Sequence, residues 1–146
     1  MEQEIEIVLI EDNPDDAALA IRALKRKNLA NKVIHLNDGE EALTFFFGAA
    51  GVPGRAEEGT PRVVLLDLNM PKVSGLEVLQ KLRSNTKTAG IPVIVLTSSS
   101  SDPKIKRCNE LGADRYIVKP VDFRSFAETV ADLGMKWIVF NHHQKV

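Results

Sequence analysis

The chain has 146 residues, of which 44% are hydrophobic and 27% charged, and its formal net charge is -1 at pH 7. This size predicts one domain with a sizeable core, and the near-zero charge gives no reason to expect binding to nucleic acid or to an anionic membrane. Cys108, the single cysteine, excludes an intrachain disulfide and a thiolate zinc site. The acidic start resembles no signal peptide, and no apolar run approaches the ~20 residues that span a bilayer, so we expect a cytoplasmic protein.

Segments that favour strands alternate with segments that favour helices. Runs of β-branched and aliphatic residues predict five strands, at residues 5–10, 33–36, 63–67, 91–96 and 116–118. Capping residues followed by apolar residues at helical spacing predict five helices, which begin after Asp12, at Glu40, at Gly75, after Pro103 and at Asp122. Residues 48–61 have no period and are predicted to form a surface loop. This order predicts an α/β fold with a doubly wound parallel sheet.

Acidic side chains follow two of the expected strands. Glu11 and Asp12 come directly after the first strand, and Asp67 ends the third. Open α/β sheets bind ligands at the carboxyl ends of their strands, so we expect the three carboxylates to lie close together. Their mutual repulsion favours a hard cation with oxygen ligands, and Mg²⁺ suits so few carboxylates. The weaker alternative is that Glu11 and Asp12 merely cap the following helix.

Two other strands also end in groups that suit phosphate chemistry. Lys119, which precedes Pro120, can pair with Asp67 or with an oxyanion attached to it, and the Thr97 hydroxyl can donate to a phosphoryl oxygen. Taken singly, a Lys-Pro pair is usually a solvated loop and a threonine at a strand end is usually a cap or turn residue. Beside the three acids, these groups favour phosphoryl transfer to Asp67 as the nucleophile.

With these residues the chain resembles the receiver domains of two-component response regulators, the chemotaxis-type single-domain regulators in particular. The matching positions are the metal-binding acid pair, the phosphoacceptor, a residue whose backbone carbonyl binds the metal, the loop after it, and the switch and phosphate-holding residues: Glu11, Asp12, Asp67, Asn69, 70–75, Thr97, Tyr116, Lys119 and Pro120. The resemblance implies a flavodoxin-like receiver fold over residues 1–140 with an extended last helix, a tail at 141–146, and no output domain.

The resemblance also implies the function of these residues. Asp67 would accept a phosphoryl group from a histidine kinase with the help of Mg²⁺, and hydrolysis of the acyl phosphate would reset the domain. Such a protein is not an enzyme in the usual sense, because it catalyses only its own phosphorylation and dephosphorylation. Thr97 would move toward the phosphoryl group and Tyr116 would swing inward; a buried core tyrosine is the alternative. Asn69 and Ser99 would flank the attacking water, and the short, uncharged Ser99 predicts a phosphorylated lifetime that is not very short.

A narrower resemblance concerns the small regulators that pair with bacterial and cyanobacterial phytochrome kinases, and it is carried by the long 48–61 segment and the extended last helix. The apolar excess late in that helix predicts a homodimer, with a tail folded back on its own domain as the alternative. The residues predicted for this interface are Phe123, Phe126, Trp137 and Phe140.

No basic helix-turn-helix follows the domain, so we expect the output to be a protein–protein contact. An aspartate-nucleophile phosphohydrolase is disfavoured, because Asn69 stands where such enzymes usually carry a general acid. A non-phosphorylated adaptor with the same fold is the remaining alternative.

Overall fold

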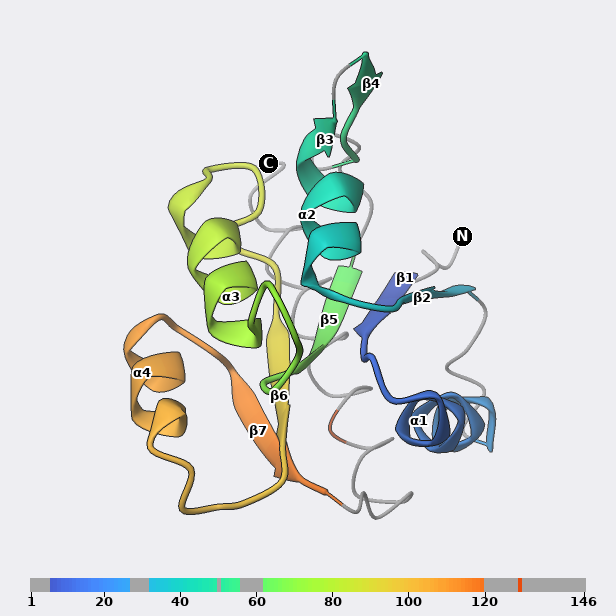
Figure 1. Cartoon of the computed structure of the whole chain (residues 1–146), viewed down its shortest axis with the longest axis vertical. Coiled ribbons are helices and arrows are strands. Elements are labelled where there is room, and N and C mark those ends of the chain that lie inside the picture. Colours follow the sequence, from blue (N-terminus) through green and yellow to red (C-terminus); the bar gives the residue numbers. More distant parts are fainter. Residues whose placement is uncertain (1–5, 27–31, 50, 56–61, 120–128, 130–146) are drawn as a thin grey trace, which may run out of the picture.

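The computed structural model describes residues 6–26, 32–49, 51–55, 62–119 and 129 (Figure 1). One sheet has the strand order β2-β1-β5-β6-β7, and every neighbouring pair in it is parallel. Its strands are β1 (Glu6–Ile10), β2 (Lys32–Leu36), β5 (Arg62–Asp67), β6 (Val93–Thr97) and β7 (Arg115–Val118). The predicted five-stranded, doubly wound sheet is therefore confirmed.

Four helices connect the strands within the described part of the chain: α1 (Pro14–Arg26), α2 (Gly39–Phe47), α3 (Gly75–Ser84) and α4 (Lys104–Glu110). Side-chain caps begin two of them, because Asp38 accepts a hydrogen bond from the backbone N–H of Glu41 and Ser74 accepts one from that of Glu77. None of these helices is long and apolar enough to cross a membrane. The fifth predicted helix, with Phe123, Phe126, Trp137 and Phe140, lies outside the described residues apart from position 129, and so does Pro120.

Alternate residues of the central strands divide the core into two layers. Ile7 and Leu9 of β1 pack with α1, whereas Val8 and Ile10 pack in the layer that contains α2 and α3. Figure 1 accordingly shows the sheet between α1 on one side and α2, α3 and α4 on the other. All residues of β1, β5 and β6 are buried, which explains why these strands are continuous apolar runs in the sequence rather than alternating ones. Cys108 is 2% exposed and packs in the layer that contains α2 and α3.

The segment after α2 differs from the unstructured loop predicted for residues 48–61. It contains two short antiparallel strands, β3 (Gly48–Ala49) and β4 (Val52–Pro53). Gly51 adopts a φ of 78°, a left-handed conformation that glycine allows without strain and that lets the chain reverse between the strands. The strands are only two residues each, too short to show a period of two in the sequence. Residues 56–61 lie outside the described part.

The loop between β5 and α3 holds Asp67 against the start of α3. A Cβ atom added to Gly75 would lie 2.4 Å from the carbonyl oxygen of Asp67, so only glycine allows this approach. The backbone N–H of Gly75 also donates to the carbonyl of Leu68 at 3.2 Å. Lys72 in the same loop has a φ of 64°, which is uncommon outside glycine and costs on the order of 1 kcal/mol. The loop is thus tightly defined beside the residue predicted to react.

Candidate functional site

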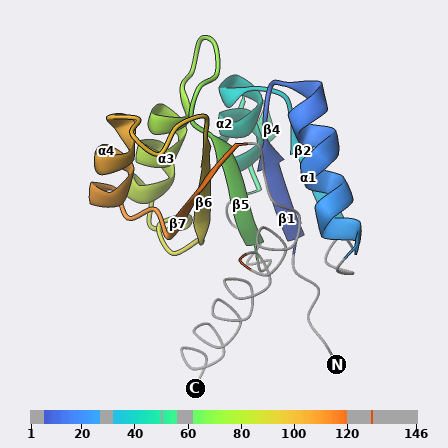
Figure 2. The same cartoon turned by 90° about the horizontal axis from the view of Figure 1, so that it is seen from below.

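The register of β1 and β5 brings the predicted acids together. Ile10 pairs with Leu66, so Glu11 and Asp67, the next residue on each strand, come side by side. Figure 2 shows β1 and β5 lengthwise, with the loops that follow them at one edge of the sheet. Glu11 and Asp67 are 0% and 3% exposed, whereas Asp12 is exposed. Two of the three carboxylates are therefore buried, and the third is exposed to solvent.

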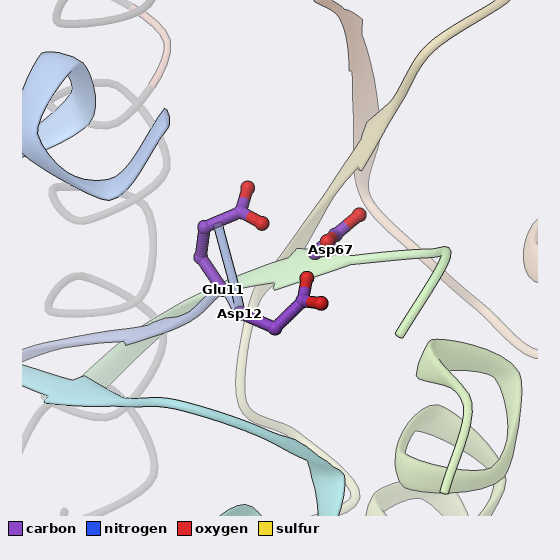
Figure 3. A group of neighbouring side chains, drawn as sticks. All are labelled: Glu11, Asp12 and Asp67. Carbon is purple, nitrogen blue, oxygen red and sulfur yellow. The ribbon is translucent and has the colours of Figure 1, made fainter. Parts of the chain in front are cut away.

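One carboxylate oxygen from each of Glu11, Asp12 and Asp67 lies within 4.8 Å of the other two (Figure 3). The three side chains come from the ends of β1 and β5. The Oε1 atom of Glu11 is buried and lies 2.7 Å from the Lys119 ammonium. Three carboxylate oxygens this close together form the kind of donor set that a hard cation such as Mg²⁺ prefers. The three predicted carboxylate ligands thus fit such an ion.

Burial changes the protonation of the predicted nucleophile. It raises the pKa of Asp67 to about 8, and the neighbouring Glu11 carboxylate adds to this rise. The charge of Lys119 and the backbone N–H of Asn69, which donates to Asp67 Oδ1 at 3.1 Å, act in the opposite direction. Without a further cation, Asp67 therefore holds a proton at neutral pH.

Lys119 supplies the positive charge of the site. Its Nζ lies 2.7 Å from Glu11 Oε1, 3.0 Å from Asp16 Oδ2 and 3.5 Å from Asp67 Oδ1. Burial lowers the pKa of this lysine, but hydrogen bonds and charges from Glu11, Asp16 and Asp67 outweigh that effect and raise it well above its usual value. The predicted pairing of Lys119 with Asp67 is present. One lysine nevertheless faces more carboxylates than it can neutralise.

The hydroxyl of Thr97 donates to the Ser99 carbonyl oxygen at 3.2 Å and to Asp102 Oδ2 at 3.4 Å. Thr97 itself is fully buried, and its carbonyl accepts a hydrogen bond from the backbone N–H of Lys119 at 2.7 Å. To donate to a phosphoryl group on Asp67, the hydroxyl must first leave Asp102 and Ser99. The hydroxyl group of Ser99 forms a hydrogen bond with that of Ser101, with 2.9 Å between their Oγ atoms.

The other predicted site residues lie in exposed positions. Tyr116 is 46% exposed, so the alternative that it is a buried core tyrosine is wrong. The expected inward swing of Tyr116 stays a prediction. Asn69 is exposed, and its Oδ1 accepts a hydrogen bond from Lys104 Nζ at 2.5 Å.

Three residues of the site were missed by reasoning from the sequence: Asp16, Asp102 and Lys104. Asp16 lies in the first turn of α1, and Lys104 begins α4 after the loop that contains Asp102. Both helices start at the carboxyl edge of the sheet. A search of the loops and first helical turns that follow site strands would have found these residues.

The raised pKa of Asp67 predicts how the stability of the metal-free protein depends on pH. Folding raises this pKa from 3.8 to about 8, so between these values the folded state retains a proton that the unfolded chain has released. The free energy of unfolding should therefore fall as the pH rises through this range.

Urea denaturation in EDTA measures this free energy at each pH, with Asp67→Asn as the control, since asparagine does not titrate. The difference between the two proteins should change steadily from acidic pH to pH 8. A difference that is independent of pH would contradict the prediction.

Residues 7–131 match the response regulator receiver domain family. The chain belongs to this family. Two curated relatives are the probable methanogenesis regulatory protein FilR2 of Methanothrix harundinacea (36% identical, covering 92% of this chain and 84% of the relative) and the response regulator Rcp1 of Synechocystis (32% identical, covering 90% and 88%). The receiver fold and the recognition made from the sequence are thereby confirmed.

Solved structures of phytochrome response regulators are also similar to this receiver domain. The bacteriophytochrome response regulator RtBRR is 45% identical, with a TM-score of 0.78 over 91% of this chain and 79% of that chain. The phosphorylated cyanobacterial phytochrome response regulator RcpA is 30% identical, with a TM-score of 0.73 over 94% and 95%. The Mn²⁺-bound form of Rcp1 is 31% identical, with a TM-score of 0.67 over 90% and 93%.

Proposed function

We propose that this receiver domain accepts a phosphoryl group on Asp67 from a histidine kinase, changes its partner contacts, and resets by hydrolysis. The observation that carries the proposal is the buried Asp67 carboxylate, which lies beside Glu11 and Asp12 on one side and within 3.5 Å of Lys119 Nζ on the other. An anionic oxygen between a metal-binding acid pair and a fixed ammonium suits attack on phosphorus, because the developing charge is met by groups already in place.

Each residue has a defined task in this reaction. A carboxylate oxygen of Asp67 forms the new bond to phosphorus as the phosphoryl–nitrogen bond of the donor histidine breaks. Lys119, already 3.5 Å from Asp67 Oδ1, then holds a transferred oxygen. The carboxylates of Glu11, Asp12 and Asp67, with the backbone carbonyl of Asn69, would hold Mg²⁺, which supplies positive charge to the phosphoryl oxygens and keeps Asp67 ionised.

Two relatives support this proposal through the forms in which their structures have been solved. RcpA has been solved in a phosphorylated form and Rcp1 in an Mn²⁺-bound form. The likeness to RtBRR further favours a phytochrome-type kinase as the partner. The homodimer expected from the sequence stays a prediction, and light scattering on the phosphorylated and unphosphorylated protein tests it.

The test is incubation of the purified protein with acetyl phosphate, with Mg²⁺ or with EDTA, followed by intact mass measurement. We expect one phosphoryl adduct that forms only with the metal. If no adduct forms with Mg²⁺, the chain is a binding module with the receiver fold. Continuous hydrolysis of a simple phosphate ester such as p-nitrophenyl phosphate would instead support a phosphohydrolase, whereas we propose that the domain turns over only its own acyl phosphate.

A further inference from the structure

The side-chain contact between α4 and the β5–α3 loop points to an additional residue that controls the site. Lys104 begins α4, and its Nζ donates to the side-chain oxygen of Asn69 at 2.5 Å. Asn69 is two residues beyond Asp67 and donates its backbone N–H to Asp67 Oδ1 at 3.1 Å. Lys104 thus contacts a residue that itself donates a hydrogen bond to the Asp67 carboxylate.

The start of α4 is itself held by the site. Asp102 Oδ1 accepts a hydrogen bond from the backbone N–H of Lys104 at 3.0 Å, and Asp102 Oδ2 accepts one from the Thr97 hydroxyl at 3.4 Å. Lys104 is therefore not an isolated surface lysine, because its backbone is fixed by the same carboxylate that holds Thr97. The hydrogen bonds of Asp102 therefore link Thr97 to Lys104. The Lys104 side chain extends this link from the start of α4 to Asn69.

Resetting consumes one water molecule. The water oxygen bonds to phosphorus, the bond between phosphorus and the Asp67 oxygen breaks, and the products are the Asp67 carboxylate, inorganic phosphate and a proton released to solvent. In-line attack requires the water to approach from the side opposite Asp67. A side-chain acceptor near that path can orient the water by accepting one of its protons in a hydrogen bond.

We propose that Lys104 slows this hydrolysis by occupying the side-chain oxygen of Asn69. A lysine ammonium carries three donors and no acceptor, so it cannot orient the attacking water in place of the oxygen that it covers. The inference rests on the proposed function, since it concerns the lifetime of phosphorylated Asp67. Lys104 is a positioning residue here, because it acts through Asn69.

The test compares hydrolysis of the phosphorylated full chain in the unsubstituted protein and in Lys104→Met, which keeps a chain of similar length without the charge. The protein is phosphorylated with acetyl phosphate and Mg²⁺, the donor is removed, and loss of the adduct is followed by intact mass. We expect hydrolysis to be about three- to tenfold faster in Lys104→Met, the effect of freeing one exposed hydrogen bond to a charged group. Lys104→Arg, which keeps the donors, should retain slow hydrolysis.

Two further variants separate this role from a structural one. Lys106→Met changes an exposed lysine of the same helix and should leave hydrolysis unchanged. In an Asn69→Ala background, Lys104→Met should have no further effect, because the covered oxygen is already absent. The urea denaturation midpoint of Lys104→Met should match that of the unsubstituted protein, whereas a mainly structural role of Lys104 would lower it.

The outcomes distinguish this inference from the proposed function. If the unsubstituted protein forms no Mg²⁺-dependent adduct, both fail. If the adduct forms normally but decays equally fast in Lys104→Met and in the unsubstituted protein, only the role of Lys104 is overturned. The same conclusion follows if the acceleration persists in the Asn69→Ala background.

Discussion

Replacing Asp67 with asparagine is expected to abolish the Mg²⁺-dependent phosphoryl adduct, with a loss of at least about a thousandfold in the rate of its formation. The amide of asparagine is nearly the same size as the carboxylate but has no anionic oxygen to attack phosphorus. Asp67 is 3% exposed, and because the amide fills the same space the substitution opens no cavity. The variant should therefore fold but form no phosphoryl adduct. Circular dichroism measures its folding, and intact mass measures the adduct.

A matched control for this variant is Asp15→Asn, in which an exposed carboxylate in the first turn of α1 is replaced. It changes the net charge by the same amount without touching the acid cluster. We expect adduct formation close to that of the unsubstituted protein. An adduct that persists undiminished in Asp67→Asn would show that another residue accepts the phosphoryl group.

Replacing Glu6 with glutamine is expected to destabilise the fold by about 3–5 kcal/mol, because it removes one charge of the buried ion pair with Arg62. Glu6 and Arg62 are each 1% exposed, and Arg62 Nε lies 2.6 Å from Glu6 Oε1. Lys32 and Arg55 approach the other carboxylate oxygen at 3.0 and 3.4 Å. These residues lie at the amino ends of the strands or, for Arg55, after β4, away from the carboxylates of Glu11, Asp12 and Asp67.

Chemical denaturation measures the free energy of unfolding of this variant, with Arg107→Met as the comparison. Arg107 pairs with Glu110 on the surface of α4, where the two side chains are 52% and 50% exposed. Loss of that solvated pair should cost no more than about 0.5 kcal/mol. A cost below about 1 kcal/mol for Glu6→Gln would show that the buried pair contributes little. Phosphorylation by acetyl phosphate should remain normal in Glu6→Gln wherever the variant is folded.

The main elements of the fold and the clustering of the candidate site residues could be predicted from the sequence. Strands that are buried on both faces are continuous apolar runs, and β5, which ends at Asp67, and its neighbours β1 and β6 are of this kind. Parallel strands place their carboxyl ends at one edge of the sheet. A carboxylate, a threonine and a lysine at strand ends therefore indicate a shared site already in the sequence. Local pattern and topology together therefore determined that Asp67, Thr97 and Lys119 would meet.

The contacts that tune the site could not be predicted in this way. Whether Lys104 reaches Asn69, or Asp102 holds the Thr97 hydroxyl, depends on how α4 packs and on the side-chain conformations chosen there. Exposed lysines and aspartates occur at many helix starts, and spacing along the chain does not distinguish them. The partners are 35 residues apart in one pair and 5 in the other.

The ion pair between Glu6 and Arg62 shows the same limit at the other end of the sheet. Charged residues that flank an apolar run usually lie in solvent, and nothing in the sequence marks these two as buried. Their burial follows from the register of β1 and β5, which places Glu6 opposite Arg62. The order of apolar and polar residues thus determined the sheet and the edge at which the candidate site residues gather. Tertiary packing alone decided which charged side chains are buried, how they pair, and how the pKa of Asp67 is raised, because burial and charge distance are properties of the folded chain.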